Sequence, residues 1–172
     1  FLERVRARTE GLPGFRLFPG HAPRVLDACL ADPACTKIVL TRNPLDSYIS
    51  LKIARATGQW WMGDGTRRRR ARVRFDDAEF RDELDRRAGF YEHVRRALMK
   101  SGQTAFQVRY GDLGDDAVIA GVARYLGVDV APLRPVRAGQ VQNPEPAIEK
   151  VDNPGEMTAA LQRLDLFGLL AD

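Results

Sequence analysis

The sequence predicts an α/β domain built on a parallel sheet. Apolar, β-branched runs at 36–41 and 104–110 have the composition of strands, and a segment with helical signals follows each run. A long amphipathic segment, with apolar residues spaced for one helical face, separates the two runs. Strands that alternate with helices in this order predict a doubly wound parallel sheet.

Three helices have recognisable start signals, in which a capping residue stands before the first turn: Asn43 with Pro44, Asp76, and Asn153 with Pro154. The first of these helices is predicted to run to about residue 57. The second is predicted to end at Gly102, since glycine is the usual residue after a last helical turn. The apolar stripe of the second helix comprises Phe80, Leu84, Ala88, Tyr91, Val94 and Leu98.

The remaining elements are shorter. Alternation over 14–18 predicts a strand, and apolar spacing predicts helices over 25–30 and 117–126. Residues 58–74 have no periodicity and are predicted to form a long loop, whereas the Pro-rich stretch 131–152 is expected to wrap the surface. No internal repeat or domain boundary interrupts residues 1–172, so a single domain is expected.

The composition is that of an ordinary soluble protein. The chain has 172 residues, of which 44% are hydrophobic and 29% charged, enough for one substantial core. No apolar run has transmembrane length, and no signal-peptide pattern opens the chain. Cys29 and Cys35 match no metal-binding pattern and are too few for a disulfide framework. We therefore expect reduced cysteines, no metal and a cytoplasmic location.

The basic residues are unevenly distributed. Of the 27 basic residues only four are Lys, and seven Arg fall between positions 67 and 81, with 67–70 unbroken. Two interpretations remain open: a solvated, mobile loop, or a patch for an anionic acceptor such as a glycolipid or acidic polysaccharide. Nucleic acid ranks below both, because no aromatic residue interrupts the basic run and Trp60 and Trp61 precede it.

A candidate phosphate site lies where the first predicted buried strand ends. Arg42 follows this strand directly, and the helix that begins at Pro44 presents its positive end at the same place. Positions 43, 47 and 50 share one helical face, so the Ser50 hydroxyl can reach the same pocket. An Arg, a hydroxyl and a helix N-terminus are suited to a phosphate. Alternatively, Arg42 pairs with Asp46, and Ser50 bonds back to its own helix.

This segment resembles the 3′-phosphate-binding segment of the sulfotransferases, in which a strand ends in Arg-Asn-Pro or Arg-Asp-Pro and a Ser follows eight residues after the Arg. Arg42 and Ser50 keep this spacing. The residues 50–60 are similar to the helix exit of bacterial nodulation-type and lipopolysaccharide-type sulfotransferases, and 106–113 resembles the family's second strand. The segments 124–128 and 142–154 also fit, so the resemblance covers nearly the whole chain.

The resemblance implies a P-loop NTPase-like fold and 3′-phosphoadenosine 5′-phosphosulfate as the sulfuryl donor. It implies a carbohydrate or glycolipid hydroxyl as the acceptor. Arg42 and Ser50 would bind the 3′-phosphate, and Tyr110 would lie near the adenine, although a core role for Tyr110 remains an alternative. Here Gly111 replaces the Glu that usually follows this aromatic. Asp112 is expected to cap the next helix, His21 to lie at the surface and His93 to be structural.

One part of the family pattern does not occur in the sequence. No Gly-rich loop of the kind that cradles the 5′-phosphosulfate follows a predicted strand, and we expect it upstream of an N-terminally incomplete chain. The alternative is a non-catalytic remnant of the fold that binds a nucleotide or an anionic glycan. The sequence assigns no catalytic base, acceptor or oligomeric state.

Overall fold

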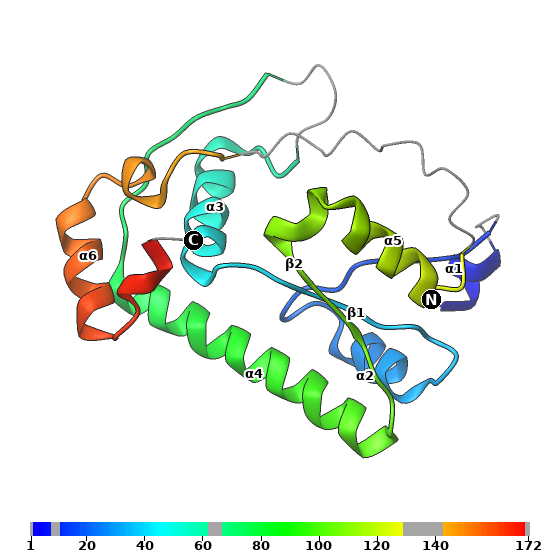
Figure 1. Ribbon diagram of the computed structural model, residues 1–172. Coiled ribbons are helices and arrows are strands. Elements are labelled where there is room, and N and C mark those ends of the chain that lie inside the picture. The colour runs from blue at the N-terminus through cyan, green and yellow to red at the C-terminus, as the bar shows by residue number, and fades with distance from the viewer. Residues whose placement is uncertain (1, 8–10, 62–66, 129–142, 171–172) are drawn as a thin grey trace.

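The computed structural model describes residues 2–7, 11–61, 67–128 and 143–170 (Figure 1). The elements in chain order are α1 (Leu2–Ala7), α2 (Pro23–Ala31), β1 (Ile38–Thr41), α3 (Pro44–Thr57), α4 (Asp77–Ser101), β2 (Phe106–Arg109), η1 (Tyr110–Gly114), α5 (Asp116–Tyr125), η2 (Ala147–Lys150), α6 (Pro154–Arg163) and η3 (Phe167–Leu170). None of the described helices is long and apolar enough to cross a membrane.

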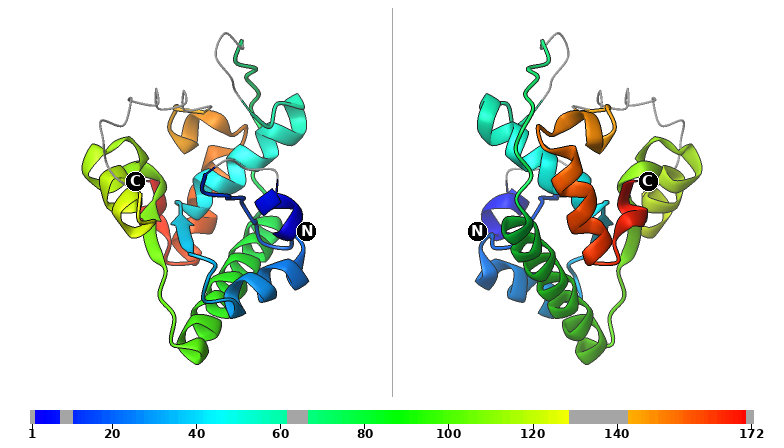
Figure 2. Two further views of the ribbon diagram at one scale, coloured as in Figure 1. Left: turned by 90° about the vertical axis from the view of Figure 1, so that its right-hand side faces the viewer. Right: turned by 90° about the vertical axis from the view of Figure 1, so that its left-hand side faces the viewer.

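The two strands pair in parallel, as the sequence predicts. The register runs from Ile38 opposite Phe106 to Thr41 opposite Arg109. Helices α4 and α2 lie on one side of this pair and α5 on the other (Figures 1 and 2). The described residues therefore form a mixed α/β fold around a two-stranded parallel sheet.

The main core lies beside the sheet, where α3, the start of α4 and α6 meet. The rings of Tyr48, Phe75 and Phe80 pack against one another with centroids 5.4–5.7 Å apart. Met157 and Leu161 of α6 complete this cluster and are fully buried. A smaller apolar cluster, formed by Leu30, Val94 and Leu98 with Val39 against them, joins α2 and α4 to the sheet.

Local capping explains why the predicted boundaries of α3 and α4 are correct. The Asn43 Oδ1 accepts hydrogen bonds from the backbone N–H groups of Leu45 and Asp46, at 2.9 and 3.2 Å. The Asp76 side chain accepts one from Glu79 at 2.9 Å. Helix α4 ends at Gly102, whose φ of 64° is left-handed and favours glycine.

The prediction that β1 is a buried strand is wrong for the described residues. Ile38 and Leu40 are 43% and 44% exposed. Their register partners Phe106 and Val108 lie on the same face, where the ring of Phe106 packs against Tyr125 of α5. Helix α5 thus covers β2 without covering β1. The strand predicted over 14–18 is also wrong, since these residues are irregular.

Two capping predictions are wrong, for different reasons. Asn153 precedes α6 but makes no capping bond; its Oδ1 accepts from the backbone N–H of Phe75 and its Nδ2 donates to the Phe75 carbonyl. Helix α5 is capped by Asp115, whose carboxylate accepts from Ala117, and not by Asp112. Asp112 lies in η1 instead.

The predicted loops are better packed than their sequences suggest. Val73 and Phe75 are buried, and Val73 forms a parallel bridge with Val151. Lys150 and Val151 are also buried, so the expectation that the Pro-rich stretch runs over the surface is wrong for this part. The part of that stretch from 131 to 142 lies outside the described residues.

Candidate functional site

Arg42, Ser50 and Tyr110 come together at the carboxyl ends of the two strands. Arg42 directly follows β1 and Tyr110 directly follows β2, so the parallel register brings them side by side. The Arg42 guanidinium carbon lies 4.4 Å from the centroid of the Tyr110 ring. Its Nη2 donates a hydrogen bond of 3.1 Å to the Ser50 Oγ. All three predicted site residues thus form one half-buried cluster.

The charge of Arg42 is not compensated by a carboxylate among the described residues. The predicted alternative partner, Asp46, instead accepts from the Lys150 Nζ at 2.9 Å. The Ser50 Oγ takes its hydrogen bond from Arg42, in contrast to the alternative of a bond to its own helix. Since the oxygen acts as an acceptor, the hydroxyl hydrogen is left to donate. A cation and a hydroxyl donor are therefore held together without an anion.

The helix N-terminus contributes less than the sequence predicts. The N–H groups of Leu45 and Asp46 are taken by the Asn43 side chain, and the Ser47 N–H donates to the Asn43 carbonyl at 3.1 Å. An anion at this place would receive the favourable helix dipole but not these hydrogen bonds. Binding of a phosphate would consequently depend on side chains rather than on backbone N–H groups.

Two residues of α4 support the site, of which the sequence named Tyr91 only as part of the apolar stripe and did not name Arg87. The Tyr91 hydroxyl donates to the Leu40 carbonyl at 3.0 Å, and the Arg87 Nη2 donates to the Ser47 Oγ at 3.1 Å. These two hydrogen bonds hold the end of β1 and the first turn of α3 against α4. Arg87 lies one turn before Tyr91 on α4. Its position next to the predicted apolar stripe could have indicated from the sequence that it faces the rest of the fold.

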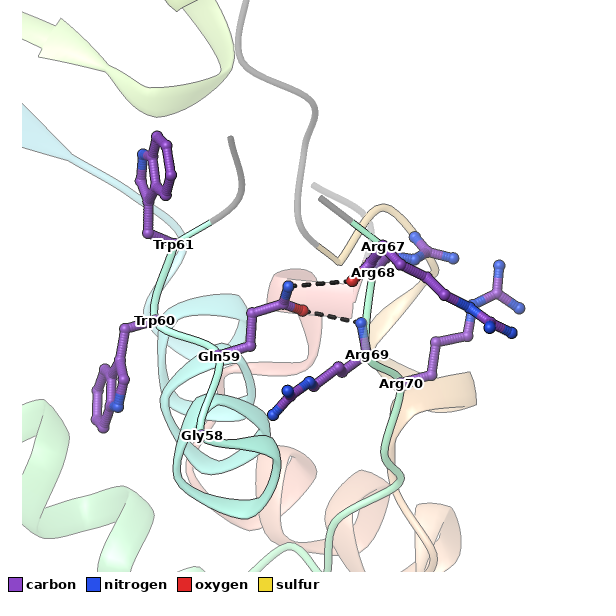
Figure 3. A pocket seen from close by; sticks show the side chains of 8 residues that line it. All are labelled: Gly58, Gln59, Trp60, Trp61, Arg67, Arg68, Arg69 and Arg70. Carbon is purple, nitrogen blue, oxygen red and sulfur yellow. Dashed lines mark hydrogen bonds between the residues drawn. The ribbon is translucent and has the colours of Figure 1, made fainter. Parts of the chain in front are cut away.

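A second candidate site is a hollow of about 770 Å³ at the opposite end of α3 (Figure 3). It lies between two short segments, Gly58–Trp61 and Arg67–Arg70. Gln59 joins them: its Nε2 donates to the Arg67 carbonyl at 3.2 Å, and its Oε1 accepts from the Arg69 N–H at 2.8 Å. The hollow thus brings the only two Trp residues of the chain next to its unbroken Arg run.

The other titratable residues considered from the sequence lie elsewhere. His21 packs edge-on against Phe18, with ring centroids 5.3 Å apart, and His93 bonds to Asp27 at 2.8 Å. Cys29 and Cys35 are free thiols, and burial, with the neighbouring Cys35, raises the pKa of Cys29 to about 11. No group of three potential metal ligands occurs within the described part of the chain.

Comparison with known proteins identifies no relative of this chain. No family model, no curated protein and no solved structure matches the chain.

Proposed function

We propose that this chain is a sulfotransferase domain that moves a sulfuryl group from 3′-phosphoadenosine 5′-phosphosulfate to a hydroxyl of a carbohydrate or glycolipid. The observation that carries the proposal is the cluster of Arg42, Ser50 and Tyr110. The motif spacing selects these residues, and the Arg42 side chain, at the end of β1, contacts both Ser50 and Tyr110. Ligands of open α/β sheets bind at this edge.

The cluster fits a 3′-phosphate on a nucleoside. Arg42 is positively charged, has no carboxylate partner among the described residues, and can offer two parallel N–H groups to a phosphate. Ser50 would donate to a further phosphate oxygen. One face of the Tyr110 ring is covered by Arg42, so an adenine would stack on the other face.

Within this proposal the chain acts mainly by positioning the donor. Sulfuryl transfer runs in line from a phosphate leaving group to an acceptor hydroxyl, and correct placement of the two substrates lowers the barrier. Arg42 and Ser50 would fix the position of the donor by binding its 3′-phosphate, which takes no part in the reaction. Neither His21 nor His93 is assigned as the base, because each contacts residues away from the cluster.

The proposal also implies a larger sheet. A P-loop NTPase-like, doubly wound fold needs further strands, and within the described residues β1 pairs only with β2. The exposed side chains of Ile38 and Leu40 are consistent with a sheet that is covered more fully in the complete fold.

A second candidate is a non-catalytic domain that binds a nucleotide or an anionic glycan. It is favoured by one observation: the described residues include one cluster suited to a phosphate and no second cradle for a 5′-phosphosulfate next to it. Turnover separates the two candidates. Sulfuryl transfer from a radiolabelled donor supports the enzyme, whereas nucleotide binding without transfer supports the second candidate.

The site itself is tested by comparing two nucleotides by calorimetry. Arg42→Ala should weaken binding of adenosine 3′,5′-bisphosphate by about tenfold or more, because a hydrogen bond to a charged group is worth about 1.5–3 kcal/mol. Binding of adenosine 5′-monophosphate, which has no 3′-phosphate, should change little. Arg109→Ala is the matched control, since Arg109 is an exposed Arg at the end of the adjacent strand. Equal losses for both nucleotides would refute the assignment.

A further inference from the structure

The first two turns of α3 carry two Arg–Ser pairs on one helical face. The Arg42 Nη2 donates to the Ser50 Oγ, and the Arg87 Nη2 donates to the Ser47 Oγ, each at 3.1 Å. Ser47 and Ser50 are three positions apart in α3, so their side chains are neighbours on the helix surface. The two pairs therefore lie about one turn apart, and their Arg side chains come from different segments of the chain.

Helix α4 brings Arg87 to the junction of β1 and α3, where Arg42 stands. The Tyr91 hydroxyl donates to the carbonyl of Leu40, two residues before Arg42. Arg87 lies one turn earlier on α4 and donates to Ser47, five residues after Arg42. In Figure 1, α4 passes below this junction. The contacts of α4 thus lie on both sides of Arg42 in the sequence and place Arg87 beside the same strand end.

The positive charge of Arg87 is only partly compensated. Among the described residues its one carboxylate contact is with Glu83, at 3.8 Å between Nη1 and Oε1, and Arg86 holds the same carboxylate more closely. Arg42 has no carboxylate partner within the described ranges. Three Arg side chains and one carboxylate leave a surplus of two positive charges. The Arg87 side chain is 17% exposed, so water and salt screen its charge less than that of a surface Arg.

The two serines add hydrogen-bond donors to this charge. Each Oγ accepts a hydrogen bond from its Arg, so each hydroxyl keeps its hydrogen for an acceptor, and the described residues form no such bond. The face thus presents the N–H groups of two guanidiniums and two O–H groups. Donors with a surplus of positive charge are suited to an anion with several oxygen acceptors, whereas a neutral ligand would leave the two charges unpaired.

We propose that Arg87 and Ser47 are the second half of the candidate phosphate site, in which the two Arg–Ser pairs bind one phosphate monoester between them. Residues three apart on a helix have Cβ atoms about 5–6 Å apart. An N–H donor lies about 2.9 Å from its acceptor oxygen, so one phosphate can receive bonds from donors about 6 Å apart. The spacing of the two pairs therefore fits one phosphate group.

Two Arg side chains also specify the charge of the ligand, and here the inference rests on the proposed function. A phosphate monoester carries about −1.5 to −2 charges at pH 7, which matches two guanidiniums. A phosphodiester carries a single charge and would leave one guanidinium uncompensated. The 3′-phosphate of the proposed donor is a terminal monoester, whereas a nucleic acid backbone consists of diesters. The site should therefore select a 3′-phosphorylated nucleotide and exclude internal positions of a nucleic acid.

Calorimetry on the intact chain tests the role of Arg87. Arg87→Gln should weaken binding of adenosine 3′,5′-bisphosphate by about tenfold or more and change binding of adenosine 5′-monophosphate little. Arg96→Gln is the matched control: Arg96 is nine positions later on α4, on the opposite side of the helix, and pairs with Glu92. It removes the same charge and should change the affinity less than about threefold. Equal losses in the two variants would show nonspecific attraction and overturn the assignment of Arg87.

Two further variants decide the question if Arg87→Gln does not fold. Glu83→Gln removes the carboxylate that competes for Arg87 and preserves the size of the side chain, so the bisphosphate should bind about threefold more tightly. Ser47→Ala removes a phosphate donor but no charge, and it should weaken binding by about threefold or more. Unchanged affinity in both variants would show that Arg87 only holds α3 and α4 together and would overturn the proposal.

A comparison of two ligands tests the number of charges. Adenosine 2′,3′-cyclic monophosphate carries one negative charge, and adenosine 3′-monophosphate carries close to two at about pH 7.5. The wild type should prefer the second ligand by about tenfold or more, and Arg87→Gln should reduce this preference to about threefold. A preference that Arg87→Gln leaves unchanged would refute the second charge at the site.

These outcomes are distinguishable from failure of the proposed function, because none of them requires sulfuryl transfer. Loss of affinity in both Arg42→Ala and Arg87→Gln, without turnover, would leave a phosphate-binding domain and refute only the enzyme. Loss in Arg42→Ala alone would refute only the second half of the site. A wild type that binds the bisphosphate no more tightly than adenosine 5′-monophosphate would refute both.

Discussion

The ion pair between Asp46 and Lys150 links the first turn of α3 to the segment before α6, and its two partners are unequally buried. The side chain of Lys150 is 6% exposed and that of Asp46 is 28% exposed, with Nζ and Oδ1 2.9 Å apart. The other bond of the Lys150 ammonium, to the Asn143 carbonyl, is long at 3.4 Å. Removal of Asp46 and removal of Lys150 should therefore lower the free energy of unfolding by different amounts.

Asp46→Ala leaves a buried ammonium without a carboxylate. Breaking a buried pair in this way typically costs 3–5 kcal/mol, and the partial exposure of Asp46 places the expected loss near the lower limit, at about 3 kcal/mol. Lys150→Met leaves a carboxylate that water already reaches and fills the space of the Lys chain, so we expect a loss of about 1 kcal/mol. The double variant should be more stable than Asp46→Ala alone.

Urea unfolding of the wild type, both single variants and the double variant measures these free energies in one thermodynamic cycle. Nucleotide binding provides a further control, because Asp46 does not contact Arg42 and both variants should retain the affinity for adenosine 3′,5′-bisphosphate. The reasoning would be refuted if Lys150→Met proved as costly as Asp46→Ala, since burial of the unpaired charge would then not determine the loss.

Two further predictions concern a thiol and a pair of glycines. Because burial raises the pKa of Cys29 to about 11 from 9.0, its thiol should be alkylated by iodoacetamide at pH 8 more slowly than Cys35. The raised pKa favours the protonated thiol in the folded state, so this contribution to stability should be complete below about pH 9 and be lost as the pH rises toward 11. Comparable alkylation rates would contradict the burial argument. A Cβ at Gly121 would lie 3.1 Å from the Phe106 ring, so Gly121→Ala should cost about 1 kcal/mol of unfolding free energy after its gain in helix propensity. Gly89→Ala, in open space on α4, should instead stabilise by up to about 1 kcal/mol, and equal shifts in thermal unfolding would rule out the steric explanation.

Signals that act over a few residues made α3, α4 and the candidate site predictable. The capping bonds of Asn43 and Asp76 join residues two or three positions apart, so the sequence contains both partners in one window. Arg42 stands just before α3 and Ser50 lies within it, eight positions later, so a long Arg side chain directed along the helix can reach the Ser50 hydroxyl. Tyr110 joins them because each of two parallel strands ends immediately before its site residue.

Interactions between distant segments explain what the sequence could not predict. Asn153 has the residue type and position of a helix cap. Its side-chain amide instead forms hydrogen bonds with both the backbone N–H and the carbonyl of Phe75, 78 positions away. The sequence suggested Arg42, four positions away, as a possible partner of Asp46. The actual partner is Lys150, 104 positions away. In the same way, the sequence could not show which Arg of the Arg-rich loop form ion pairs, because the carboxylate partners lie far along the chain, at Glu145, Asp152 and Glu156.

The error about β1 has a different cause and bears on the proposed fold. Its apolar, β-branched sequence is that of a strand buried on both faces, as parallel strands usually are. One face meets this expectation, because Val39 packs against the α2–α4 cluster, but Ile38 and Leu40 on the other face lie beyond the edge of α5. The sequence therefore specifies more burial than the described residues supply. This uncovered face ends at Arg42, so any apolar layer that covered it would also enclose the proposed phosphate site and strengthen the charge interactions there.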